Sequence, residues 1–266
     1  MAKAPGRQHA TAEMPFLDHL EELRWRIIWS LAALAVGVAV AFVLMVKVDV
    51  IGVLQRPIAP LLGGRKLVFT HPGDPFGIVM KASFTLGLIF ALPVILYQAW
   101  AFLSPALYQH EKRLVVPVLV GATVLFLAGV SLAYFVVLPF TLTFLLGFQT
   151  QALEPMITAG QYFGFAINMA LVFGAVFELP IAIVALTALG IVTPPMLRRF
   201  RRHAVVLCLV GSAFITPGQD VMSLLLLSLP LYVLYELSIS LSGVVYRRRE
   251  RRIAAETDAS RGEVIA

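Results

Sequence analysis

The sequence is poor in two kinds of residue that soluble proteins use freely, namely cysteine and charged side chains. Cys208 is the only cysteine among 266 residues, so no disulfide can form within the chain, and a buried, unreactive thiol is expected. Charged residues make up 14% of the chain and hydrophobic residues 59%, and the mean hydropathy is +0.88. Because these values lie outside the range of soluble domains, the composition predicts an integral membrane protein.

The usual motifs of catalysis are also missing. The glycine pair in Gly63-Gly64-Arg65-Lys66 lacks the spacing of a phosphate-binding loop. No zinc-binding pair stands out among the five histidines, which are scattered at positions 9, 19, 71, 110 and 203. We therefore expect neither an enzyme nor a bound cofactor or metal.

Long apolar runs are what the sequence has in abundance. Six are visible, at residues 27–46, 76–103, 115–146, 160–189, 204–216 and 221–244. A membrane helix needs about 20 apolar residues to cross a hydrocarbon core of roughly 30 Å, and the first four runs meet this length. The last two are separated by the turn-forming stretch Thr216-Pro217-Gly218-Gln219-Asp220. The predicted fold is an all-α bundle of six transmembrane helices, of which the last two are short.

Prolines within or at the ends of the runs predict helices that are kinked. They stand at positions 93, 117, 139, 180 and 230, and each removes a backbone donor from its helix. Kinked helices suit a concave, curved bundle better than a straight one. The loop at 47–75 is the longest connection and leaves room for a short helix around Val50–Leu62. We expect one membrane domain over residues 14–249, with disordered tails at 1–13 and 250–266.

The basic residues predict the orientation of the spans. With the N-terminus in the cytoplasm, 16 of the 21 Lys and Arg residues lie on the cytoplasmic side, and the C-terminus lies there too. The basic run from Arg247 to Arg252 follows the last span, where such runs bind anionic lipid rather than nucleic acid. The first apolar run is too long for a cleavable signal peptide.

One carboxylate, Glu178, interrupts the apolar run Gly160–Leu189. A charge at membrane depth costs several kcal/mol, roughly 2.5–3.5 on insertion scales, so it normally faces protein or water. Glu178 can serve an ion or proton relay, contact a substrate, or receive another membrane helix. The structural alternative is that Asn168 or a hydroxyl group satisfies it within its own bundle.

Two further carboxylates lie in aromatic-rich segments that we place on the cytoplasmic side. Before the first span, leucines at helical spacing form an apolar stripe beside Glu22, which can pair with Arg26 one turn later or await an external cation. The charge pattern favours neither interpretation. After the second run, Tyr97–Arg113 contains Glu111 beside two basic residues, so Glu111 can also be a solvated loop charge.

Taken together, these motifs resemble the TatC family, the core membrane subunit of the twin-arginine protein translocase. The stretch Asp18–Arg26 is similar to that family's entry motif, and residues 93–113 to its second span and first cytoplasmic loop. Phe177-Glu178-Leu179-Pro180 matches its polar fourth span, and residues 197–202 its second cytoplasmic loop. The resemblance runs from about Phe16 to Arg249.

The resemblance implies specific roles for several residues. TatC proteins bind signal peptides with two consecutive arginines and export folded proteins with TatA- and TatB-type single-span partners, in an oligomeric complex driven by the proton gradient. It places recognition of the arginines at Glu22 and Glu111, supported by Leu20, Arg24 and Phe102. This fits the planar, bidentate pairing of guanidinium with carboxylate. Docking of a partner helix is implied at Glu178, Thr216, Asp220 and Glu236.

Some features leave other interpretations open. Asp220 can simply cap the last helix, and Glu236 can be structural. The turn before Asp220 is one residue longer than the family's common form, and Leu224 stands where many relatives carry glutamine, which puts partner contacts there in doubt. The competing hypothesis is a proton-coupled transporter or proton channel that uses Glu178 and Glu236 as a relay.

Overall fold

The computed structural model describes residues 14–103, 115–147, 156–215 and 221–265. Over these residues the chain is helical, and its only β-type pairing is an isolated bridge between Val68 and Thr158. The helices are α1 (Met14–Lys47), α2 (Val50–Gln55), α3 (Asp74–Leu103), α4 (Val115–Leu132), α5 (Leu138–Gly147), α6 (Ala159–Phe177), α7 (Leu179–Ala188), α8 (Pro194–Arg199), α9 (Arg201–Ile215) and α10 (Val221–Ile265). A 3₁₀ turn, η1 (Ala59–Leu62), and a π-helical turn, η4 (Ala133–Val137), complete the set. This confirms the predicted all-α membrane fold.

Five helical segments of the described chain are long and apolar enough to span a membrane. They are His19–Lys47, Asp74–Phe102, Val116–Gly147, Ala159–Ala188 and Val221–Arg247. The remaining predicted span is α9, which has 15 residues and is therefore only about 22 Å long. The last two spans were both expected to be short, and this is wrong for the final one, since its apolar segment has 27 residues. Pro230 lies inside α10 without ending it, as neighbouring groups in membrane proteins allow.

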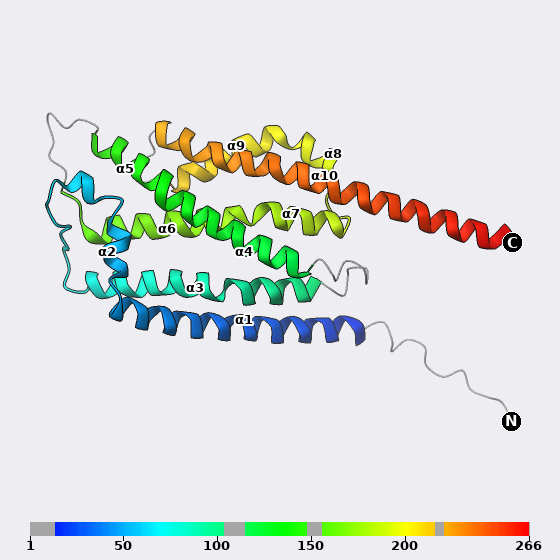
Figure 1. Cartoon of the computed structure of the whole chain (residues 1–266), viewed down its shortest axis with the longest axis horizontal. Coiled ribbons are helices and arrows are strands. Elements are labelled where there is room, and N and C mark those ends of the chain that lie inside the picture. Colours follow the sequence, from blue (N-terminus) through cyan, green and yellow to red (C-terminus); the bar gives the residue numbers. More distant parts are fainter. Residues whose placement is uncertain (1–13, 104–114, 148–155, 216–220, 266) are drawn as a thin grey trace, which may run out of the picture.

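The C-terminal part of α10 also differs from the expected disordered tail at 250–266. The helix continues to Ile265, well beyond the apolar segment. Arginine, alanine and glutamate dominate the first residues of this extension, and all three have high helix propensity. The start of α1, the end of α3, α8 and the far half of α10 lie at the same end of the molecule (Figure 1).

Two of the predicted proline positions interrupt their helices. Pro139 follows η4, where the backbone N–H of Leu138 bonds to the carbonyl of Ala133 in the wider π pattern. This turn accommodates a proline ring that would otherwise meet the carbonyl four residues earlier. Pro180 lies in the first turn of α7, and Glu178 is both the C-cap of α6 and the N-cap of α7. The fourth span is therefore broken at its only carboxylate.

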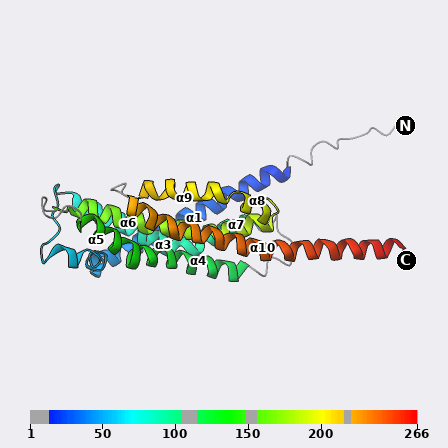
Figure 2. The same ribbon diagram turned by 90° about the horizontal axis from the view of Figure 1, so that it is seen from above.

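The helices pack in a sequence of neighbours that places α1 and α9 on opposite flanks. α1 packs mainly on α3, α3 on α6 and α4, α4 on α6, α7 on α10, and α10 on α9 (Figures 1 and 2). Glycines bring two of these pairs close together. A Cβ atom at Gly87 of α3 would lie 2.5 Å from the Cα of Val38 in α1, and one at Gly129 of α4 would lie 2.7 Å from the carbonyl oxygen of Phe173 in α6.

The short helix predicted around residues 50–62 is present as α2 and η1, at the end of the molecule away from α8. Two tyrosines fix it to the bundle. The hydroxyl of Tyr162 in α6 donates to the carbonyl of Leu54 at 2.6 Å, and the hydroxyl of Tyr134 in η4 donates to that of Val53. Carbonyls in the last turn of a helix have few partners within the helix, and these hydroxyls supply contacts from the bundle. The Val53 carbonyl also accepts from the backbone N–H of Arg56 at 3.1 Å.

Candidate functional site

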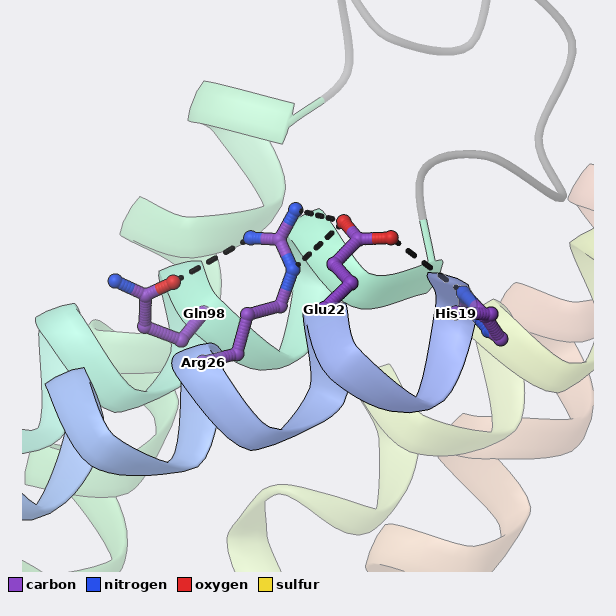
Figure 3. A network of polar contacts seen from close by, with 4 residues as sticks. All are labelled: His19, Glu22, Arg26 and Gln98. Carbon is purple, nitrogen blue, oxygen red and sulfur yellow. Dashed lines mark hydrogen bonds and ion pairs between the residues drawn. The ribbon is translucent and has the colours of Figure 1, made fainter. Parts of the chain in front are cut away.

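A polar cluster forms where the first turns of α1 face the end of α3. Glu22, Arg26 and His19 lie three or four residues apart on α1, so helix geometry alone brings them onto one face. Arg26 donates from Nε to Glu22 Oε1 at 3.0 Å, and its Nη2 contacts the same oxygen (Figure 3). His19 Nδ1 lies 3.4 Å from Glu22 Oε2. Both carboxylate oxygens of Glu22 thus have neighbours within α1.

The helix α3 contributes the other side of this cluster. Gln98 accepts from Arg26 Nη1 at 3.4 Å (Figure 3). The ring of Phe102 stacks on His19 with centroids 4.3 Å apart and planes 10° apart. We call His19, Glu22, Arg26 and Gln98 the α1–α3 polar cluster. It remains accessible, since the side chain of Glu22 is 33% exposed and that of Arg26 is 23% exposed. The cluster combines a carboxylate, a guanidinium and an aromatic platform at the rim of the bundle.

The predicted recognition residues are distributed around this cluster. Phe102 belongs to its aromatic side, while Leu20 and Arg24 are exposed on α1 beside it. Glu111, predicted to act together with Glu22, lies outside the described residues, although α3 leads into its segment. Of the two interpretations of Glu22, the pairing with Arg26 is present in the structure. Binding of an external cation stays a prediction.

Trp100 adds a buried donor two residues after Gln98. Its indole is 8% exposed, and Nε1 has no hydrogen-bond partner within the described ranges. Buried indole groups usually find a partner. Glu111 follows α3 in the sequence but lies outside the described residues.

Glu178 occupies a different environment at the break between α6 and α7. The side chain is half-buried, and its Oε1 is shielded from solvent without any hydrogen-bond partner in the part of the chain that is described. Asn168, proposed as an internal partner, is exposed and makes no such bond there. An unsatisfied buried carboxylate oxygen is unfavourable, by about 1–3 kcal/mol or more.

An apolar groove of about 1230 Å³ lies beside this carboxylate, between α5, α6, α9 and α10. Val176 and Leu179, which flank Glu178 in sequence, line it, whereas Glu178 itself does not. Its few polar groups include Gln161, Asn168 and Tyr235. Asn168 lies in the middle of α6, within the fourth span, so the groove offers an exposed amide there.

Cys208 also faces this groove. It is free, as expected, but half-buried rather than fully enclosed.

Glu236, the carboxylate of the last span, is satisfied by its neighbours. Arg201 Nη2 at the start of α9 donates to Oε2 at 2.7 Å, and the Tyr232 hydroxyl donates to Oε1 at 2.9 Å. These bonds support the structural interpretation of Glu236. The other two predicted docking residues, Thr216 and Asp220, lie outside the described residues.

Some contacts of the candidate site could have been predicted from the sequence, and others could not. His19 stands three residues before Glu22, so helical spacing could have identified it. Gln98 reaches the guanidinium of Arg26 from another helix, and Arg201 reaches Glu236 in the same way; no local pattern predicts such pairs. The exposure of Asn168 depends on the groove, which forms only when four helices assemble.

Comparison with known proteins adds independent information. The family described as Sec-independent protein translocase protein (TatC) matches residues 18–230. The chain is 40% identical to the Sec-independent protein translocase protein TatC of Aquifex aeolicus (strain VF5) over 239 residues, which is 89% of this chain and 98% of that protein. It is 34% identical to TatCy of Bacillus subtilis (strain 168), over 94% of this chain and 97% of that protein.

A solved structure also has the same arrangement of helices. The crystal structure of the twin arginine translocase receptor TatC in DDM superposes with a TM-score of 0.77 at 40% identity, and the match covers 84% of this chain and 99% of that one.

Proposed function

Because the chain belongs to the TatC family of Sec-independent protein translocase proteins, we propose that it is the subunit that recognises twin-arginine signal peptides. Recognition takes place at the cytoplasmic face of the cytoplasmic membrane, where both termini lie. Glu22 and Glu111 each receive one arginine, with Leu20, Arg24 and Phe102 beside them. The subunit acts as a receptor and scaffold, not as an enzyme. Anionic lipids bind the basic residues on its cytoplasmic side.

The observation that carries this proposal is that the α1–α3 polar cluster already binds a guanidinium group. Two nitrogens of Arg26 contact one oxygen of Glu22, and a third reaches Gln98. Such charge-assisted, planar pairing suits arginine and is unavailable to the single ammonium group of lysine. The site lies at the end of the molecule where α8 and the basic half of α10 also lie (Figure 1).

Exposed ion pairs contribute little on their own, so the peptide needs further contacts. The apolar segment that follows the arginines can lie against the membrane-facing sides of α1 and α3, where Leu31, Val38 and Phe84 line an apolar depression. Recognition then combines two guanidinium pairs with burial of apolar surface.

Docking of TatA- and TatB-type single-span partners is the second part of the proposal. The unpartnered oxygen of Glu178 and the exposed amide of Asn168 support it, because a partner helix with a polar side chain would satisfy groups that lipid cannot. The groove beside them has the apolar lining that such a helix needs. Thr216, Asp220 and Glu236 belong to the same proposed docking region. Export of folded cargo by this assembly draws on the proton gradient.

Photo-crosslinking of a twin-arginine peptide to this protein in membranes tests the recognition proposal. We expect strong crosslinking that is lost when both arginines become lysine, and lost equally in the Glu22→Ala and Glu111→Ala variants. Equal crosslinking by the arginine and lysine peptides would contradict it.

A proton relay through Glu178 and Glu236 is the second candidate, favoured by the unpartnered oxygen of Glu178. The relay has to break the bonds that Arg201 and Tyr232 make with Glu236. It predicts pH-dependent ion flux in vesicles that contain the purified protein alone, whereas the receptor proposal predicts none.

A further inference from the structure

Arg26 occupies the carboxylate to which we assign the signal peptide, and this makes it a specificity determinant. We propose that Arg26 is a built-in competitor that an incoming arginine must displace from Glu22, and that Gln98 receives the displaced side chain. The inference rests on the proposed function, because it concerns how the same site distinguishes arginine from other cations. Arg26 itself is not among the residues predicted to recognise the signal peptide.

The acceptor capacity of Glu22 shows why displacement is required. A carboxylate offers about four lone-pair positions, two on each oxygen. Two nitrogens of Arg26 contact Oε1, and His19 Nδ1 lies 3.4 Å from Oε2. About one position remains, so an incoming cation can add a single hydrogen bond to the occupied site. The two parallel bonds of an arginine–carboxylate pair form only after Arg26 leaves.

Gln98 gives Arg26 a second position to occupy. Its Oε1 already accepts from Nη1 at 3.4 Å, on the side of the guanidinium that faces away from Glu22 (Figure 3). Arg26 can therefore rotate onto Gln98 without losing every partner or leaving the rim of the bundle. Because the Arg26 side chain is 23% exposed, this movement requires no opening of the core.

Competition of this kind raises the selectivity of the site. When a peptide arginine replaces Arg26, one guanidinium–carboxylate pair is exchanged for another, and the exchange costs little. A peptide lysine forms a point contact and cannot compensate for the pair that it breaks. Arg26 therefore weakens binding of every cation, but it weakens binding of lysine more than binding of arginine.

The opposite role for Arg26 would be to orient Glu22 for the peptide. In that case removal of Arg26 would weaken binding of the arginine peptide and would not improve binding of any other peptide. The two roles differ in the sign of the effect, so titrations can separate them.

The test compares half-saturating peptide concentrations for photo-crosslinking in membranes containing the full-length protein. Twin-arginine and twin-lysine peptides are titrated against the native chain, Arg26→Gln, Arg26→Lys and the matched control Arg202→Gln. Arg202 is exposed on α9 and carries the same charge. We expect Arg26→Gln to improve binding of the lysine peptide, so that the arginine-to-lysine selectivity falls by roughly three- to fivefold, the size of an exposed ion pair.

Arg26→Lys should change selectivity in the same direction but less, and Arg202→Gln should leave the ratio as in the native chain. Weaker binding of the arginine peptide to Arg26→Gln, or an unchanged selectivity ratio, would overturn the inference. If Arg26→Gln fails to fold, as judged by thermal unfolding in detergent, Arg26→Lys decides by the same criterion. Failure of the native chain to distinguish the two peptides would instead refute the proposed function.

Discussion

Glu22 and Glu178 are both carboxylates on long apolar helices, but their surroundings are opposite. Glu22 lies at the accessible end of α1, where Arg26 and His19 from the same helix contact its two oxygens. Glu178 lies at the break of the fourth span, where one oxygen is buried without a partner among the described residues. Among the described residues, both oxygens of Glu22 have partners, whereas one oxygen of Glu178 has none.

We infer from this contrast that the two carboxylates have different roles. A carboxylate with accessible partners can exchange one cation for another at little cost, which suits reversible recognition. A buried carboxylate oxygen without a partner is unfavourable until a group from outside satisfies it, which suits assembly with another helix. Glu236 resembles Glu22 in this respect, because Arg201 and Tyr232 satisfy it.

The largest effects are expected from adding a methyl group where helices meet closely. In Gly87→Ala the new Cβ would approach the backbone of α1 at 2.5 Å, and in Gly129→Ala it would approach that of α6 at 2.7 Å. Overpacking of this kind costs about 1–3 kcal/mol of folding free energy, which thermal unfolding in detergent would measure. Gly87→Ala should also reduce peptide crosslinking, since Gln98 and Phe102 depend on the α1–α3 contact, whereas Gly129→Ala should spare it.

Each helix offers a matched control for this comparison. A Cβ at Gly77 of α3 or Gly121 of α4 would meet nothing within 4 Å, so alanine there should be neutral or stabilising. If all four substitutions destabilised the protein equally, the effect would not come from the close helix contacts at Gly87 and Gly129.

An intermediate effect is expected when the two carboxylates are replaced by leucine. Glu178→Leu removes an oxygen whose burial without a partner costs about 1–3 kcal/mol, so the isolated chain should unfold at a higher temperature. Glu22→Leu removes the partner of Arg26 and His19, so the unfolding temperature should stay the same or fall. A lower unfolding temperature for Glu178→Leu would mean that a group within the chain already satisfies Glu178.

The smallest effect is expected at Glu236. Glu236→Gln keeps an acceptor for Tyr232 and loses only the charge that faces the exposed side chain of Arg201. Surface pairs of this kind contribute little, so thermal unfolding and peptide crosslinking should both match those of the native chain. A loss of partner association in this variant would give Glu236 the docking role that the family resemblance implies.

Much of the membrane fold could be predicted from the sequence, because apolar run length and proline position act locally. The runs matched helices, and Pro139 and Pro180 marked the two interruptions. The length of the final helix was underestimated, since the sequence predicts a short last span and a disordered tail from residue 250. In a membrane helix, neighbouring groups compensate for a proline, and propensity alone extends a polar segment.

The candidate sites were predictable only where partners lie one turn apart. The Glu22–Arg26 pair follows from helical spacing, which the sequence displays directly. The contributions of Gln98 and Phe102 depend on how closely α1 and α3 approach at Gly37 and Gly87. The lack of a partner for Glu178 is likewise a property of the assembled bundle.

The division of work between the two carboxylates is tested most directly by one paired measurement. Crosslinking of a twin-arginine peptide and co-purification of single-span partners are measured in the same membranes for the native chain, Glu22→Gln and Glu178→Gln. We predict that Glu22→Gln loses peptide crosslinking and retains the partners, while Glu178→Gln retains crosslinking and loses the partners. Loss of peptide crosslinking in Glu178→Gln, with crosslinking preserved in Glu22→Gln, would contradict the assignment of recognition to the α1–α3 polar cluster.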